Sequence, residues 1–141
     1  MDVQRIEGGL HVDQRGVVSF VNDFDLKNVD RFYTVRAHTV GEPRGWVGHR
    51  KEDKWFTPLA GTMLISVVAP DDWEHPTTNV VVQRYILSSL KPAVLHVPAG
   101  HATASVMLTP DALLGVFSSG RIEDAGKDDY RFDVGTWDIR G

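Results

Sequence analysis

A histidine that lies between basic residues is the part of this chain best suited to chemistry. His49 stands in the segment PRGWVGHRKEDK, with Arg44 before it and Lys54 after it. An imidazole titrates near neutral pH and can carry a proton, and a neighbouring cation can stabilise an oxyanion or bind phosphate. A structural histidine bonded to a backbone carbonyl, with two surface cations, would give the same sequence. The segment therefore predicts either a proton-transfer site or an ordinary strand with solvated ends.

A phenol and a guanidinium form a second candidate group. Arg31 and Tyr33 are two residues apart in DRFYTV, so on a strand they share a face. Together they could grip a diphosphate or a sugar hydroxyl, and packing in a barrel wall is the equal alternative. His101 follows a Pro-x-Gly turn, where it is either at the rim of a binding site or an exposed turn histidine.

Short apolar or alternating runs predict the strands that would position these residues. β-branched residues recur between turn segments such as GEPRG, PDDWEHP and SSLKP, a pattern typical of an all-β barrel or sandwich. No window keeps an apolar face at helical spacing, so helices should be few and short. The polar stretch 118–129 is the best candidate for an irregular loop, and the tail is expected to pack back through Phe132 and Trp137. The runs are 17–21, 30–40, 46–49, 55–59, 62–69, 80–87, 93–97, 103–108 and 112–117.

Composition narrows the possible partners. The 141 residues, 42% of them hydrophobic, fit one domain over 1–141. The absence of cysteine excludes disulfides, thiolate metal sites and cysteine nucleophiles, and it is compatible with the cytoplasm. A net charge of −4 disfavours a general nucleic-acid binder. No apolar run approaches the length of a membrane span or a secretory leader. We expect a cytoplasmic protein that binds neither nucleic acid nor membrane.

The spacing around His49 resembles the metal motif of the cupins, G-x5-H-x-H-x(3,4)-E-x6-G, with its ligands replaced. Counting back from Gly61, the glutamate position holds Lys54 and the two histidine positions hold His49 and Val47. The second half-motif, P-x-G-x-x-H, appears as PAGHAT with Thr103 at the ligand position. One imidazole beside a cation cannot hold zinc or iron, which take three or more N, O or S ligands. The resemblance implies a cupin without metal or cofactor.

Further matches resemble the cupins that isomerise or epimerise nucleotide-linked 4-keto-6-deoxy sugars. These are the dTDP-sugar 3,4-ketoisomerases and dTDP-4-dehydrorhamnose 3,5-epimerase. The segment DQRG with Phe20 is like the family's D-x-R-G-x-x-x-x-F, and RFY is like the ketoisomerases' R-V-Y-Y. RG with His49, then KWF, PAG and an Asp-rich tail with Trp137 follow in the family's order. The matches extend over most of the chain.

The resemblance implies an all-β cupin fold, a double-stranded β-helix or jelly-roll barrel, assembled as a homodimer with shared N-terminal strands. It implies a nucleotide-sugar substrate, most simply a dTDP-linked 4-keto-6-deoxy sugar, and metal-free proton transfer of the 3,4-ketoisomerase type. His49 would be the base, since it matches the second histidine of R-G-x-H-A-H. The other implied catalytic residues are Lys54 and Arg44, at the oxyanion, and the implied substrate-binding residues are Arg15, Arg31, Tyr33 and His101, with Arg15 placed to act across the dimer interface.

Two departures from the family pattern leave other activities open. The 3,5-epimerases carry their base three residues after the same arginine, where this chain has Val47, and their tyrosine acid falls at the GVF of 115–117. A 3,5-epimerase-like enzyme of deoxysugar biosynthesis is one alternative, and a non-catalytic cupin that binds a sugar nucleotide is another. A metal-dependent cupin oxygenase or isomerase is a third, which the ligand count opposes.

The purified protein should contain no stoichiometric transition metal, because Val47, Lys54 and Thr103 occupy three of the four ligand positions. Elemental analysis of protein purified without chelators checks this. About one zinc, iron, nickel or manganese per chain would contradict both the prediction and the alignment with the cupin motif.

Overall fold

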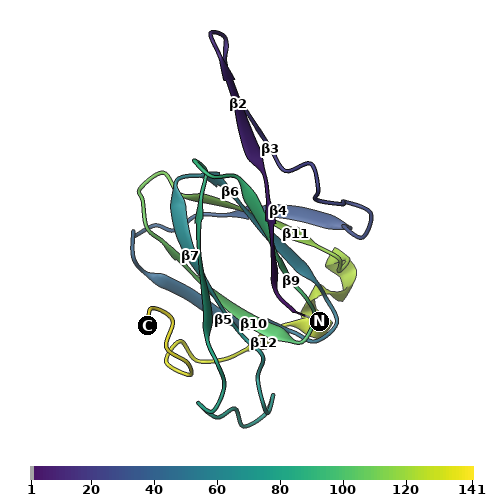
Figure 1. Cartoon of the computed structure of the whole chain (residues 1–141). Helices are drawn as coiled ribbons and strands as arrows, with labels where there is room; N and C mark the ends of the chain where they lie inside the picture. Colours follow the sequence, from purple (N-terminus) through teal and green to yellow (C-terminus); the bar gives the residue numbers. More distant parts are fainter. Residues whose placement is uncertain (1) are drawn as a thin grey trace.

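The computed structural model describes residues 2–141, which form two facing β-sheets and a projecting hairpin (Figure 1). Both five-stranded sheets are antiparallel, with the orders β1-β9-β6-β11-β4 and β12-β5-β10-β7-β8. The elements are β1 (Gln4–Glu7), β2 (Gly9–Asp13), β3 (Gly16–Phe20), β4 (Arg31–Val35), β5 (Pro43–His49), β6 (Lys54–Ala60), β7 (Thr62–Val68), β8 (Gln83–Ser88), β9 (Ala93–Val97), β10 (His101–Met107), β11 (Leu113–Ser118), the 3₁₀ helix η1 (Ile122–Asp128) and β12 (Tyr130–Arg131).

The main core lies between the two sheets. Strand alternation sends Met63, Ile65 and Val67 of β7 inward, where they meet Leu95 and Leu114 from the opposite sheet. Ile65 and Leu95 are fully buried, and burial of such a side chain stabilises the fold by roughly 1.5–3 kcal/mol. The sheets are therefore held together by apolar packing on their inner faces.

A second core lies on the outside of the β5-β10-β7 sheet, under the C-terminal tail. Trp46 of β5 is fully buried and packs edge-to-face on Trp137, with ring centroids 5.2 Å apart. Its indole nitrogen donates to the Trp137 carbonyl at 3.3 Å, and the Ser66 hydroxyl donates to the Ile139 carbonyl at 2.6 Å. Phe132 packs on the same cluster. The expectation that the tail returns to the body through Phe132 and Trp137 is confirmed.

Strands β2 and β3 form a two-stranded hairpin that extends away from the body (Figure 1). Val12 and Val17 are directly paired on one face and are 66% and 59% exposed. Leu10, Val18 and Phe20 are exposed on the same hairpin. The hairpin therefore presents an apolar surface to solvent. A chain of this length has a core large enough to bury such side chains, so their exposure is unusual.

The predicted all-β class is confirmed, and the differences from the expected strands are local. The run expected over 30–40 is a strand only over Arg31–Val35, and the chain then turns through residues 36–42 into β5. The run expected over 80–87 forms β8 from Gln83. The stretch 118–129, expected to be irregular, contains η1. Within the described residues, no helix has the length and apolar character needed to cross a membrane.

Replacing Gly61 with Ala should lower the free energy of unfolding by about 1–3 kcal/mol. Gly61 has φ +67°, and an added Cβ would clash with Thr109, Asp111 and Ala112. Gly100→Ala separates the two causes, because Gly100 has φ +92° but open space around it. Gly126→Ala, with open space and no left-handed φ, is the control. Urea unfolding should rank the losses Gly61 above Gly100 above Gly126; equal stability of all three variants would contradict the packing argument.

Candidate functional site

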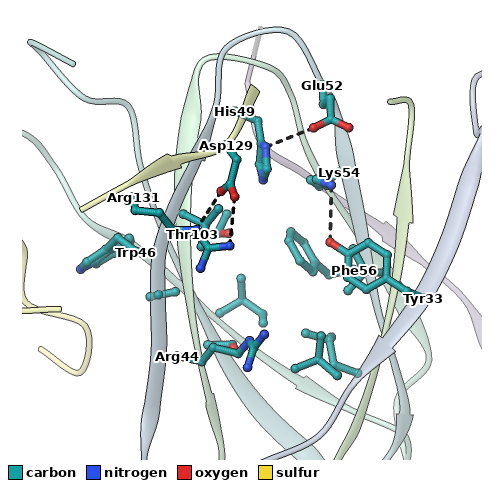
Figure 2. A pocket seen from close by; sticks show the side chains of 18 of the residues that line it. Tyr33, Arg44, Trp46, His49, Glu52, Lys54, Phe56, Thr103, Asp129 and Arg131 are labelled. Carbon is teal, nitrogen blue, oxygen red and sulfur yellow. Dashed lines mark hydrogen bonds and ion pairs between the residues drawn. The ribbon is translucent and has the colours of Figure 1, made fainter. Parts of the chain in front are cut away.

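A cavity of about 430 Å³ lies between the two sheets, toward the edges formed by β4 in one sheet and by β12 and β5 in the other (Figure 2). Its lining is part apolar and part charged. The apolar lining includes Val35, Phe56, Ile65, Leu114 and Val116. The charged and polar lining includes Arg31, Tyr33, Arg44, His49, Glu52, Lys54, Thr103, Ser105, Asp129 and Arg131.

His49 ends β5 with its side chain in this cavity, beside Val47, as the strand alternation predicted. Its Nδ1 lies 2.7 Å from the carbonyl oxygen of Asp128 and 3.2 Å from Oε2 of Glu52. Both oxygens act as acceptors, so Nδ1 carries the proton and Nε2 keeps its lone pair. Figure 2 shows Nε2 on the side of the ring away from Glu52, toward the cavity. Burial, and next the Lys54 charge, lower the pKa of His49, so it is a neutral base at neutral pH.

Asp128 fixes the turn that follows β5. Its carboxylate accepts the main-chain N–H groups of Arg50, Lys51 and Glu52 at 2.7, 3.0 and 2.8 Å. The side chain thereby closes the turn between β5 and β6, while its carbonyl holds the His49 ring. Asp128 therefore fixes both the conformation of this turn and the orientation of the His49 ring.

Lys54 begins β6 and is only 3% exposed. Its Nζ lies 3.1 Å from the Ser118 hydroxyl and 3.4 Å from the Tyr33 hydroxyl (Figure 2). Burial is the main cause that lowers the pKa of Lys54, and the nearby Arg31 charge acts in the same direction. Burial raises the pKa of Tyr33, which stays a phenol. Lys54 therefore releases its proton more easily than an ordinary lysine, whereas Tyr33, its hydrogen-bonded neighbour, keeps its own.

Arg31 and Tyr33 lie together, as their spacing predicted, with the guanidinium 5.1 Å from the ring centroid. Arg31 also lies 3.6 Å from Oε1 of Glu52. Glu52 is 6% exposed, and its Oε1 accepts from the Ser118 hydroxyl at 3.1 Å. Its Oε2 has no hydrogen-bond partner with good geometry, so its effect on His49 is electrostatic.

Two further arginines of the cavity, Arg44 and Arg131, differ in whether a carboxylate pairs with them. Within residues 2–141, no carboxylate lies within ion-pair distance of Arg44, which enters the cavity from β5. Arg131 instead makes two bonds to Asp129, at 2.8 and 3.1 Å. Those bonds hold the pKa of Asp129 below its usual range. Arg44 is therefore the cavity arginine most available to an anionic ligand.

The structure brings together five of the seven residues predicted from the sequence. Arg15 lies at the tip of the β2–β3 hairpin, 83% exposed and paired with Asp13 at 2.8 Å. His101 is paired across from His49 on β10, but its Nδ1 faces the Pro98 carbonyl at 2.8 Å. Neither residue lines the cavity, and their roles stay predictions.

Sequence reasoning missed Glu52, Asp128, Asp129 and Arg131. Glu52 and Asp128 resemble surface charges in the printed sequence, and most of their partners, such as Ser118 for Glu52 and residues 50–52 for Asp128, lie far along the chain. The one available signal was the position of Glu52 three residues after His49.

His49, Glu52 and Asp128 each place one potential ligand atom within 4.8 Å of the others. The Asp128 carboxylate already accepts three main-chain N–H groups, and Nδ1 of His49 donates to a carbonyl. A metal at this point would have to break those bonds. The cluster fits a hydrogen-bonded base better than a coordination site, and the predicted absence of metal is tested only by analysis of the protein.

No known family model matches this sequence, and no curated protein matches it significantly. Solved structures do resemble the fold. The 3,4-ketoisomerase QdtA from Thermoanaerobacterium thermosaccharolyticum, solved as a histidine-to-asparagine mutant with TDP-4-keto-6-deoxyglucose, has TM-score 0.72 and 17% identity over 92% of this chain and 87% of its own. The dTDP-4-dehydrorhamnose 3,5-epimerase from Bacillus anthracis, with TDP and PPi bound, has TM-score 0.77 and 18% identity over 99% and 87%. A 3,4-ketoisomerase from Helicobacter canadensis has TM-score 0.70 and 17% identity over 94% and 92%.

The chain has the cupin fold of these ketoisomerases and epimerases. The resemblance predicted from the sequence is thereby confirmed for the fold. At identities of 17–18%, the activity has to be argued from the cavity itself.

Proposed function

We propose that the protein isomerises a nucleotide-linked 4-keto-6-deoxy sugar by metal-free proton transfer between C3 and C4, with His49 as the base. The observation that carries the proposal is the orientation of His49: its Nδ1 is held by the Asp128 carbonyl at 2.7 Å, and the unprotonated Nε2 is left for the ligand. The lowered pKa of His49 supports the same role, because a general base must be neutral before it accepts a proton.

The cavity supplies the other groups that this reaction needs. The hydrogen at C3 is acidic because C4 is a ketone, and its transfer to His49 Nε2 leaves an enediolate. Lys54 or Arg44 would stabilise the oxyanion at O4. Return of the proton from His49 to C4 leaves the ketone at C3. The hydroxyl proton must also move from O3 to O4, and the Lys54–Tyr33 pair, 3.4 Å apart, is suited to pass it.

Epimerisation at C5 is less well supported by the lining of the cavity. It needs a proton donor on the face opposite the base, and the epimerase acid position falls at 115–117. Phe117 packs outward against Phe24 and Phe32, and Val116 is inward and apolar. Among the described residues, Tyr33 is the tyrosine that lines the cavity, and it is next to Lys54.

The substrate is proposed to be linked to a nucleoside diphosphate, most simply dTDP. The cavity holds three arginines and Lys54 against two carboxylates, so an anionic ligand is favoured. Similar solved structures contain TDP or TDP-4-keto-6-deoxyglucose, which makes these the first ligands to try.

Incubation with dTDP-4-keto-6-deoxyglucose in heavy water should give a 3-keto product, while C5 keeps its hydrogen. His49→Asn should lower turnover by roughly a hundredfold or more and leave ligand binding largely intact, since Asn is polar but not a base. NMR of the sugar checks both. His75→Asn, in an exposed loop, is the control and should behave as the parent. Exchange at C5 would favour an epimerase, and binding with neither product nor exchange would favour the non-catalytic cupin.

The pH dependence tests the same base. Burial and Lys54 lower the pKa of His49, so His49 stays unprotonated to a more acidic pH than an ordinary histidine. The value of kcat/KM should therefore hold its plateau below about pH 6.5, the usual histidine midpoint, and then fall. A fall that begins above this midpoint would contradict the assignment.

Arg44→Ala should weaken thymidine diphosphate binding by about tenfold or more, because a charge-assisted phosphate contact contributes roughly 1.5–3 kcal/mol. Arg31→Ala should also weaken it, whereas Arg15→Ala should do so only if the hairpin reaches a partner's cavity. Calorimetry measures the thymidine diphosphate affinity of these three variants, and Arg121→Ala, at an exposed position, is the control. If all three bind as well as the parent, the phosphate site lies elsewhere.

A homodimer is proposed from the exposed apolar hairpin, which a second copy of the chain could cover. Light scattering should give twice the chain mass, and Val12→Glu with Val17→Glu should give a monomer. Leu90→Glu, at an 82% exposed site in another loop, should leave the dimer intact. A monomer for the parent at micromolar concentrations would reject the assembly.

A further inference from the structure

Glu52 is a buried carboxylate that the proposed reaction does not use, and it stands between two groups that the reaction does use. On one side, its Oε1 lies 3.6 Å from an Arg31 nitrogen and accepts from Ser118. On the other side, its Oε2 lies 3.2 Å from His49 Nδ1 and has no well-aligned hydrogen bond. A half-satisfied buried carboxylate is costly, so its placement next to the base calls for a reason.

The orientation of His49 does not require Glu52. The Asp128 carbonyl accepts the Nδ1 proton at 2.7 Å and alone fixes the tautomer. What Glu52 adds is charge: it favours the protonated ring that forms when His49 takes a proton from the ligand. Arg31, on the opposite oxygen, competes for that charge.

We propose that Glu52 is a positioning residue that sets the basicity of His49, and that Arg31 controls how much of its charge reaches the ring. A phosphate that binds Arg31 would neutralise the guanidinium, and the Glu52 carboxylate would then act mainly on His49. Ligand binding and base strength would then be coupled, and the coupling is reciprocal. This inference rests on the proposed function only where it concerns turnover, because Glu52 and Arg31 act on the His49 ring in the protein without substrate as well.

Other charged and titratable groups also act on His49. Lys54 from β6 opposes its protonation, while Asp128 on η1 favours it. The further groups around the ring are Arg31 and Tyr33 on β4, Asp129 and Arg131 beside the cavity, and His101 across from it on β10. An experiment must therefore separate the Glu52–Arg31 pair from this background.

Two substitutions with opposite expected signs make that separation. Glu52→Gln removes a charge that favours the imidazolium, so the pKa of His49 should fall below that of the parent. Arg31→Gln frees Glu52 and removes a cation, so the pKa of His49 should rise. Titration of the His49 ring by NMR, without substrate, measures both. Lys51→Gln, on the exposed turn, is the control for loss of a charge and should stay near the parent.

The nitrogen chemical shifts of His49 give a second readout. In Glu52→Gln they should still report a proton on Nδ1, since Asp128 keeps the tautomer. Shifts of the titration in the same direction for both variants, or no shift in either, would overturn the proposal. If Glu52→Gln does not fold, Glu52→Asp takes its place: the shorter side chain keeps the charge but withdraws it from Nδ1 of His49, so the pKa of His49 should still fall, and an unchanged pKa would overturn the proposal.

The ligand arm uses thymidine diphosphate. Its addition should raise the pKa of His49 in the parent and have a much smaller effect in Arg31→Gln at saturating ligand. An equal rise of the His49 pKa in the parent and in Arg31→Gln would show that Arg31 does not couple ligand binding to His49. In turnover, the acid limb of the Glu52→Gln profile should move to lower pH, and kcat should fall by about tenfold with KM little changed. Absence of both 3-keto product and sugar exchange in the parent would reject the proposed function but would not affect the result of the His49 titration.

Discussion

The carboxylate of Asp128 organises the charged end of the cavity. Its three main-chain bonds to residues 50–52 join the segment before β12 to the turn between β5 and β6. Those residues are 76 to 78 positions apart in sequence, and the bonds to the charged carboxylate add to the pairing of β12 with β5 beside them. Once it forms, the Asp128 carbonyl meets His49, and Asp129 and Arg131 come to line the cavity.

The remaining charges are stable only as a group. Lys54 and Glu52 are nearly fully buried, and either one alone would be expensive to remove from water. Ser118 contacts both, at 3.1 Å in each case, and Arg31 lies beside Glu52. An isolated contact in this set would contribute little, yet removal of one member leaves another without a partner. The group should therefore tolerate substitution poorly, and buried titratable groups packed in this way are typical of functional sites.

The sequence was informative wherever the governing rule is local. β-branched alternation predicted the sheets, and strand periodicity correctly placed Val47 with His49 and Arg31 with Tyr33. The same rule could not find Glu52 or Asp128, because their partners are set by tertiary packing, and a charged residue in a turn is most often solvated. The hairpin was also missed as a separate unit: Val17 and its neighbours read like any core strand, since the pattern does not reveal whether a covering layer exists.

The choice between isomerase and epimerase depends on which faces of a bound sugar the protein can reach. His49 and the Lys54–Tyr33 pair are brought into the cavity by β5, β6 and β4, whereas the inward residues of β11 next to them are apolar. In the proposed reaction one imidazole would remove and return a proton, while the hydroxyls would exchange their proton through the amine and the phenol. Transfer between adjacent carbons on one face needs only these groups. Inversion at a carbon would need a donor on the far face of the sugar. The epimerase acid position falls at 115–117, where the inward residue, Val116, is apolar, so in the proposed mode of action an enolate would have only one side from which to be reprotonated.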